Sequence, residues 1–265
     1  MGTQTAVTLA PFKLEQADGT VLEGEVRVIE GGGRKPALLL GHGFRGHKDW
    51  AFWPDIAERF ARQGYYAVKF NFARIAAAKS GDARKAAETV TLSRELEDWR
   101  TIVRSAVRGE LPLAEGADLG RLAVLGHSRA GTSGLLIAGE LTEVKAAVVW
   151  NGGGAPIRPS AEEGQELTPA QQALIDDLDR NGERFDARRV FASLAIPVLI
   201  VQGEADGERL LENFKALRDL APHQSFVAIP GADHRFGAAD PYAGTTPALD
   251  IAVSETAAFL DRVFG

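Results

Sequence analysis

The sequence of 265 residues contains no cysteine, and this absence excludes several kinds of chemistry. A disulfide framework, a thiolate nucleophile, a cysteine-bound zinc ion and an iron–sulfur cluster all require cysteine sulfur. Five histidines are present, and no two of them have the spacing of a metal motif such as His-Glu-x-x-His. We therefore expect no metal and no cofactor, so that any catalysis has to use serine, histidine and carboxylate side chains.

An excess of basic charge and long hydrophobic runs are also missing. Thirty Lys and Arg residues against 36 Asp and Glu residues leave a net charge of −6, which disfavours nucleic-acid binding through a basic surface. No apolar run approaches the roughly 18 residues of a membrane span, and residues 1–11 lack the pattern of a secretory signal. We expect a cytoplasmic protein without nucleic-acid or membrane partners. A homo-oligomer is compatible with the sequence, which does not specify an oligomeric state.

The hydrophobic pattern predicts a single α/β domain that spans residues 1–265. Two β-rich runs, 7–15 and 21–29, flank Asp18-Gly19, a dipeptide typical of hairpin turns. Short unbroken apolar runs then alternate with helical segments, as in a mostly parallel sheet that is covered by helices on both faces. These runs cover residues 37–40, 67–72, 122–125, 146–150, 197–201 and 226–229.

The connection over residues 152–195 is the exception to this regular alternation. It separates two predicted strands by 44 residues, whereas connections in compact domains are usually much shorter. Within it, Thr168-Pro169-Ala170-Gln171 has the pattern of a capping box with proline at the first helical position. We expect a small insertion over one end of the sheet, which serves as a lid or cap.

The most informative stretch is Gly126-His127-Ser128-Arg129-Ala130, between a buried strand and a small-residue helix. A sharp strand-to-helix turn at this point presents the Ser128 hydroxyl at the C-terminal edge of the sheet. Small residues two positions before and after the serine allow the strand and helix to approach closely. A five-residue match can arise by chance, but the strand and helix around it are the context that the motif requires. Ser128 is therefore the predicted nucleophile.

A nucleophilic serine needs a base, and the base needs an orienting acid. The buried strand after the insertion leads to Glu204 and Asp206, and the following strand leads to His234. Both strands deliver these side chains to the edge where open α/β sheets bind ligands. We select Asp206 over Glu204 because the turn after Gly203 is expected to direct position 206 toward the site. A turn-forming or helix-capping role explains Asp206 taken alone equally well.

With Ser128, Asp206 and His234 in this order, the sequence resembles the α/β-hydrolase superfamily from about residue 21 to residue 264. The resemblance implies the α/β-hydrolase fold, with a mostly parallel sheet, helices on both faces and an N-terminal antiparallel hairpin. A second family element, His-Gly-x after the first central strand, matches His42-Gly43-Phe44. By this resemblance the backbone N–H groups of Phe44 and Arg129 form the oxyanion hole.

The nucleophile distinguishes this chain from two branches of that superfamily. The dienelactone-hydrolase branch is similar in size and in the Gly-His-Gly-Phe region but characteristically uses a cysteine, and dehalogenases place an aspartate at the elbow. With Ser128 and no cysteine, the resemblance is to a serine carboxylesterase or a dienelactone-hydrolase-like enzyme with a serine nucleophile, and the dienelactone reaction itself is not expected. Asn151 occupies the point where some branches place the acid, which supports Asp206 in that role.

The resemblance implies a cofactor-free hydrolase that cleaves small to medium carboxylic esters through an acyl-enzyme. Hydrolysis of an amide, thioester or peptide by the same triad is the alternative, and a non-catalytic binding protein on this fold is a third. We expect Trp50, His127 and Trp150 to contribute to the substrate pocket. Phe52 and Trp53 are more simply explained as core residues that hold the following helix against the sheet.

Overall fold

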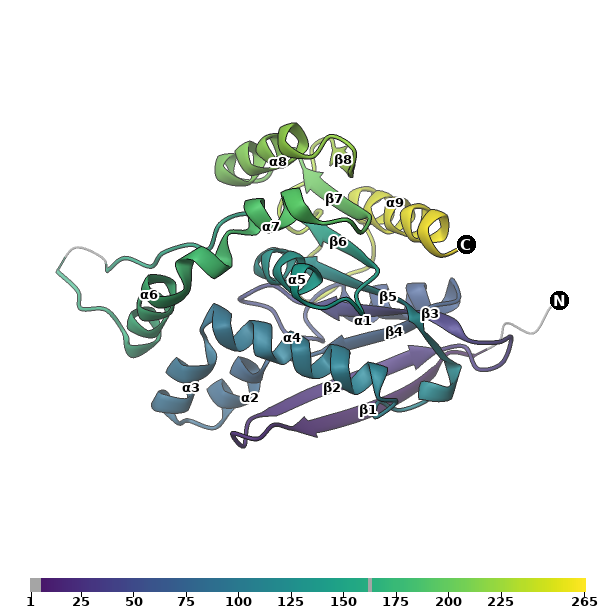
Figure 1. The fold of residues 1–265 in the computed structure, drawn as a ribbon, viewed down its shortest axis with the longest axis horizontal. Coiled ribbons are helices and arrows are strands. Elements are labelled where there is room, and N and C mark those ends of the chain that lie inside the picture. The colour runs from purple at the N-terminus through teal and green to yellow at the C-terminus, as the bar shows by residue number, and fades with distance from the viewer. Residues whose placement is uncertain (1–5, 162–163) are drawn as a thin grey trace.

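The computed structural model describes residues 6–161 and 164–265. Its sheet has the strand order β1-β2-β4-β3-β5-β6-β7-β8 (Figure 1). β1 pairs with β2 and β2 with β4 in antiparallel fashion, and every other pair is parallel. The predicted hairpin and mostly parallel sheet are thus confirmed. The strands are β1 Thr8–Glu15, β2 Val21–Val28, β3 Lys35–Gly41, β4 Tyr66–Phe70, β5 Ala117–His127, β6 Ala146–Trp150, β7 Val198–Gly203 and β8 Ser225–Ile229.

Helices cover both faces of this sheet because its central strands are apolar on both sides. Two hydrophobic clusters result, one between the sheet and α1 and α9, and the other between the sheet and α4, α5, α7 and α8. The helices are α1 Trp53–Arg62, α2 Ala73–Lys79, α3 Ala83–Thr89, α4 Leu92–Val107, α5 Arg129–Glu140, α6 Pro169–Asn181, α7 Ala187–Ser193, α8 Glu208–Leu220 and α9 Pro247–Phe264. Two short 3-10 helices, Ala114–Gly116 and Gly182–Phe185, complete the described elements.

The connection between β6 and β7 divides into two parts. Helix α6 has the predicted capping box at Thr168 and lies beside α3 and α4, away from the sheet (Figure 1). The Asp177 carboxylate fixes it there by accepting hydrogen bonds from the backbone N–H and the hydroxyl of Ser93, at 3.0 and 2.5 Å.

The second part of this connection belongs to the hydrophobic core. Phe185 and Phe191 are 2% and 0% exposed, and α7 packs on α5. Residues 185–194 are therefore not part of a lid, because their apolar side chains complete the sheet's cover. A lid role stays a prediction for the part that precedes them, of which residues 162–163 lie outside the described ranges.

Parallel strands bring distant parts of the sequence to one edge of the sheet. The loop His42–Phe44 follows β3, Ser128 follows β5, Asp206 follows β7 and His234 follows β8. No helix in the described part of the chain is both long and apolar enough to cross a membrane.

Candidate active site

Ser128 lies in a strained turn between β5 and α5. Its φ of 58° and ψ of −122° are unusual for a residue with a side chain. Its N–H donates to the Trp150 carbonyl at 2.8 Å, which anchors the turn to β6. Two glycines make room for it, because a Cβ at Gly126 would lie 2.0 Å from the Ala130 oxygen and one at Gly152 would lie 2.2 Å from the Ser128 oxygen. The predicted elbow geometry is therefore present.

The structure brings Ser128, His234 and Asp206 into one hydrogen-bonded chain. The Nε2 atom of His234 lies 2.9 Å from the Ser128 hydroxyl oxygen, and its Nδ1 atom lies 2.8 Å from Oδ2 of Asp206. The Asp206 side chain is 6% exposed and the His234 side chain 39% exposed, so that the imidazole is open to a ligand while the carboxylate is shielded. Glu204, the alternative acid, is exposed and makes no bond to His234 among the described contacts.

The environment of Asp206 keeps its side chain ionised. Burial by itself raises the pKa of this carboxyl, but the hydrogen bond with His234 and the Gly207 N–H at 2.7 Å outweigh that effect and hold the pKa below its usual value. Gln202 adds a third donor at 3.1 Å. An ionised Asp206 favours the tautomer of His234 with hydrogen on Nδ1, which leaves Nε2 free to accept the Ser128 proton.

Asn151 joins the strand end before Asp206 to the loop of His234, a role that its sequence pattern did not indicate. Its Oδ1 accepts the Gly203 N–H at 2.7 Å, and its Nδ2 donates to the carbonyl oxygens of Asp233 and His234 at 3.3 and 3.1 Å. The only sequence signal was its position directly after a buried strand at the functional edge. The structure thus identifies Asn151 as a support of the site.

Two of the expected pocket residues are buried and do not face a substrate. Trp150 is 0% exposed, donates its Nε1–H to the Thr256 hydroxyl at 3.0 Å and stacks on Trp53. His127 is 3% exposed, and its Nε2 bonds to the His234 carbonyl at 2.8 Å. The expectation for Trp150 and His127 is corrected. Packing of α1 and α9 against the sheet encloses Trp150, and the rings of Phe52 and Trp53 lie beside His127. Trp50 is only half-buried, so its contact with substrate stays a prediction.

Phe52 and Trp53 are core residues, as expected. They are 0% and 1% exposed and pack against each other with ring centroids 5.1 Å apart.

Burial lowers the pKa of His127 to about 4, so its imidazole is neutral at neutral pH.

Two backbone N–H groups lie next to the Ser128 turn. Arg129 begins α5, where the first N–H groups have no partner within the helix and carry the positive end of its dipole. Gly43 lies close to Ser128, since a Cβ built on it would be 3.2 Å from Ser128 Cβ, and Phe44 follows it directly. No acceptor in the described residues engages the N–H of Phe44 or Arg129. Both groups are available to an anion, and their oxyanion role stays a prediction.

The chemistry available at this edge is nucleophilic and acid–base chemistry. A hydroxyl, an imidazole and an ionised carboxylate are aligned, and the N-terminus of α5 begins directly after Ser128. Within residues 6–161 and 164–265, no group of three or more His, Cys, Asp or Glu side chains is arranged to hold a metal ion.

No model of a known protein family matches the sequence, and no curated protein matches it. Solved structures do match it over nearly the whole chain. The esterase domain of a Rhodothermus marinus protein is 20% identical, with a TM-score of 0.67 and coverage of 97% of this chain and 100% of that one. Est1E from Butyrivibrio proteoclasticus is 17% identical, with a TM-score of 0.68 and coverage of 95% and 98%.

A dienelactone hydrolase-like promiscuous phosphotriesterase from metagenomic libraries is also similar. It is 17% identical, with a TM-score of 0.61 and coverage of 98% of this chain and 100% of that one. Identities this low establish a shared fold and not a shared reaction. With the strand order described above, they show that this chain has the α/β-hydrolase fold.

Proposed function

We propose that this chain is a serine hydrolase that cleaves carboxylic esters of small to medium size. The observation that carries the proposal is the chain of contacts from Ser128 Oγ to His234 Nε2 at 2.9 Å and from His234 Nδ1 to Asp206 Oδ2 at 2.8 Å. Such a chain on a strained strand-to-helix turn suits nucleophilic attack on an acyl carbon. The esterases among the structurally similar proteins are consistent with this reaction.

The first half of the reaction forms an acyl-enzyme. His234 accepts the hydroxyl proton of Ser128 while Oγ attacks the ester carbonyl carbon, and the carbonyl oxygen becomes an oxyanion. The N–H groups of Phe44 and Arg129 stabilise that charge. The tetrahedral intermediate then collapses, the bond to the alcohol oxygen breaks, and the alcohol leaves with the proton from His234.

The second half releases the acid by the same steps in reverse order. Water gives a proton to His234 and attacks the acyl carbon, and the tetrahedral intermediate expels Ser128 Oγ, which regains the proton. Asp206 stays ionised throughout and stabilises the imidazolium that forms twice in each cycle. The low pKa of its carboxyl fits that role.

The test is hydrolysis of p-nitrophenyl acetate and butyrate by the wild type, Ser128→Ala and Ser254→Ala. Ser128→Ala should lower kcat on the order of 10⁵-fold or more, because no other nucleophile among the described residues is aligned with His234. Ser254 is exposed on α9, so Ser254→Ala controls for the substitution itself and should keep wild-type activity. Retained turnover by Ser128→Ala would refute the proposal.

A wider panel separates esters from the other bonds that this triad can cleave. Ferulic acid is bound in a structure of Est1E, so methyl ferulate tests aromatic acyl groups beside the p-nitrophenyl esters. Aminoacyl anilides and acyl thioesters test the amide and thioester alternatives. A fluorophosphonate probe that fails to label Ser128 would favour a non-catalytic binding protein.

A further inference from the structure

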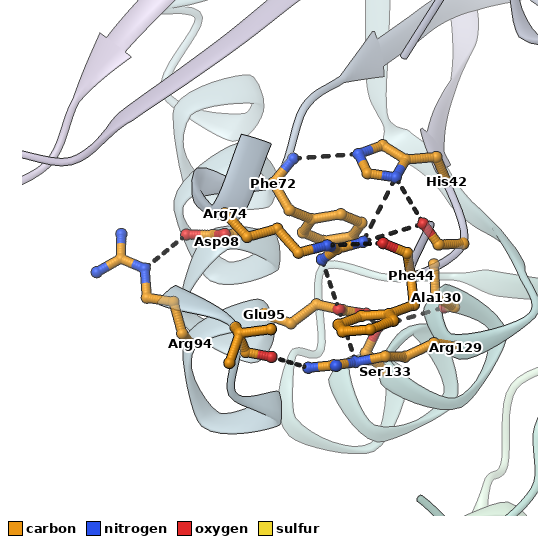
Figure 2. Close-up of polar contacts among 12 residues, drawn as sticks. His42, Phe44, Phe72, Arg74, Arg94, Glu95, Asp98, Arg129, Ala130 and Ser133 are labelled. Carbon is orange, nitrogen blue, oxygen red and sulfur yellow. Dashed lines mark hydrogen bonds and ion pairs between the residues drawn. The ribbon is translucent and has the colours of Figure 1, made fainter. Parts of the chain in front are cut away.

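The carbonyl side of the Gly43–Phe44 peptide group is bound by a buried arginine (Figure 2). Arg74 Nη2 donates to the Gly43 oxygen at 3.1 Å, and Nε donates to the Phe44 oxygen at 3.3 Å. The side chain of Arg74 is 7% exposed and comes from α2, which begins shortly after β4. The guanidinium group of Arg74, from α2, therefore binds two backbone carbonyl oxygens of the loop that follows β3.

His42 binds the same carbonyl oxygen. Its Nε2 accepts the Phe72 N–H at 3.4 Å, so the hydrogen of the neutral ring is on Nδ1, which donates to the Gly43 oxygen at 2.8 Å. Burial lowers the pKa of His42 well below 6.5, and the ring stays neutral. The Gly43 oxygen thus accepts three hydrogen bonds, the third from the Gly46 N–H at 3.1 Å.

These bonds determine where the Phe44 N–H points. The C=O and N–H of one trans peptide group point in opposite directions in the same plane. With the Gly43 oxygen directed at Arg74 and His42, the N–H of Phe44 is directed away from them, and Gly43 itself lies against Ser128. Hydrogen bonds to a carbonyl oxygen also polarise the whole peptide group, which strengthens its N–H as a donor.

A single buried carboxylate links this peptide group to the nucleophile turn. Glu95, from α4, is 1% exposed; its Oε2 pairs with Arg74 Nη1 at 2.8 Å and with Arg129 Nε at 3.0 Å. Its Oε1 accepts the Ser133 hydroxyl at 2.6 Å. The ring of Phe44 stacks beside both guanidinium groups, at 5.5 Å from Arg74 and 4.8 Å from Arg129 (Figure 2). Arg129 thus pairs with Glu95 directly, and Phe44 contacts the two guanidinium groups that Glu95 binds.

We infer that Arg74, oriented by Glu95, is a positioning residue that aims the Phe44 N–H at the oxyanion formed on Ser128. This inference rests on the proposed function. A purely structural role explains the Arg74–Glu95 ion pair less well, because hydrophobic residues that replace a buried ion pair often give a protein of equal stability. The two hydrogen bonds from Arg74 to the backbone of the loop favour a positioning role.

The test compares Arg74→Met with the wild type on p-nitrophenyl butyrate. Methionine fills similar space without a donor, so kcat should fall about 10- to 100-fold because an oxyanion donor is misplaced, while KM changes less than about twofold. Phenylboronic acid adds to a serine hydroxyl as a tetrahedral anion. Its affinity should fall by the same factor as kcat, a readout that a loss of stability alone does not move. Arg74→Lys, which keeps the charge and one donor, should recover part of both.

Two further variants keep the test decisive. Arg74→Met/Glu95→Gln removes both charges together and also the pair between Glu95 and Arg129, so it should show losses at least as large if Arg74→Met alone fails to fold. Arg94→Met is the matched control, because Arg94 pairs with Asp98 on the same helix and makes no contact with residues 42–44 among its described bonds. It should keep wild-type kcat and phenylboronic acid affinity.

The inference would be overturned if the folded Arg74 variants kept the kcat and the phenylboronic acid affinity of the wild type. If the wild type is active and its activity requires Ser128, that result would leave the proposed function intact. An equal loss in Arg94→Met would overturn it as well. A wild type without ester turnover or labelling at Ser128 would overturn both, since no oxyanion would then form.

Discussion

Asn151 shows how one amide can hold two loops of the candidate site together. It occupies a left-handed conformation, with φ of 48°, directly after β6, and bridges the strand end before Asp206 to the loop of His234. Asparagine tolerates that conformation better than most residues, and its amide both donates and accepts. An apolar residue could not satisfy the buried N–H of Gly203 and the two carbonyl groups together.

We predict that Asn151→Asp lowers kcat about 10- to 100-fold, because the loss of both N–H donors lets the His234 loop move. The aspartate keeps the acceptor for Gly203 but sets a carboxylate against two carbonyl oxygens. The free energy of unfolding should fall on the order of 1–3 kcal/mol. Steady-state kinetics and urea unfolding measure the two effects.

Gln224 offers a matched control at the opposite end of β7. Its Oε1 accepts the Val198 N–H at 2.7 Å, and its Nε2 donates to the carbonyl oxygens of Leu194 and Ile196 at 3.5 and 3.1 Å. Gln224→Glu should cost similar stability and leave kcat unchanged. Equal kcat in Asn151→Asp and the wild type would contradict the positioning role of Asn151.

At the scale of elements, the junction of β5 and α5 depends on where small residues occur. A Cβ at Gly126 would meet backbone atoms of Ala130 at 2.0 and 2.3 Å, and backbone atoms cannot rotate away. Gly134, within α5, has its nearest potential contact at 3.9 Å, with Val124 Cγ2. Gly126 is therefore required by the close approach of the Ala130 backbone, whereas the space around Gly134 would accept a methyl group.

We predict opposite effects for alanine at these two positions. Gly126→Ala should destabilise the protein on the order of 3 kcal/mol or more and abolish activity, because the strand and helix have to separate. Gly134→Ala should stabilise it by about 0.5–1 kcal/mol, since alanine favours the helix and the space is available. Thermal unfolding of both variants checks this, and a destabilised Gly134→Ala would show that the helix has no room for a methyl group.

For the whole molecule, two buried histidines link stability to pH. Burial lowers the pKa of His127 to about 4 and that of His42 well below 6.5. In the unfolded chain both rings take up a proton near pH 6.5, so between that pH and about 4 the unfolded state binds more protons than the folded state. The stability that the neutral rings contribute is complete above pH 6.5 and is lost as the pH falls through this window.

The expected outcome is a free energy of unfolding that declines steadily from pH 7 to pH 4, with His127 contributing roughly 3 kcal/mol over that range. His127→Gln keeps a donor near the His234 carbonyl and removes the titrating ring, so its decline should be shallower. His223→Gln, at an exposed position, should follow the wild type. Urea unfolding at several pH values measures the slopes, and parallel curves for His127→Gln and wild type would refute this assignment.

Local patterns were sufficient to predict the sheet, the elbow and the three side chains that meet at 2.8 and 2.9 Å. Unbroken apolar runs report burial on both faces, and a Gly-x-Ser-x-small motif between a strand and a helix reports a strained turn. Each of these features depends on residues close together in the sequence. Because the strands are parallel, their C-terminal ends lie at the same edge of the sheet, and this does not depend on how individual side chains pack.

The roles of Trp150, His127, Asn151 and Arg74 depended on the tertiary structure. Trp150 and His127 are the last residues of β6 and β5, at the edge where a pocket is expected, yet the packed helices and the rings of Phe52 and Trp53 bury them. Arg74 lies 21 residues from Glu95 and about 30 from the loop that it holds, and no periodicity relates these positions. Which polar group is paired, buried or open depends on contacts between distant segments, because solvent access and hydrogen-bond partners are set only when the helices pack on the sheet.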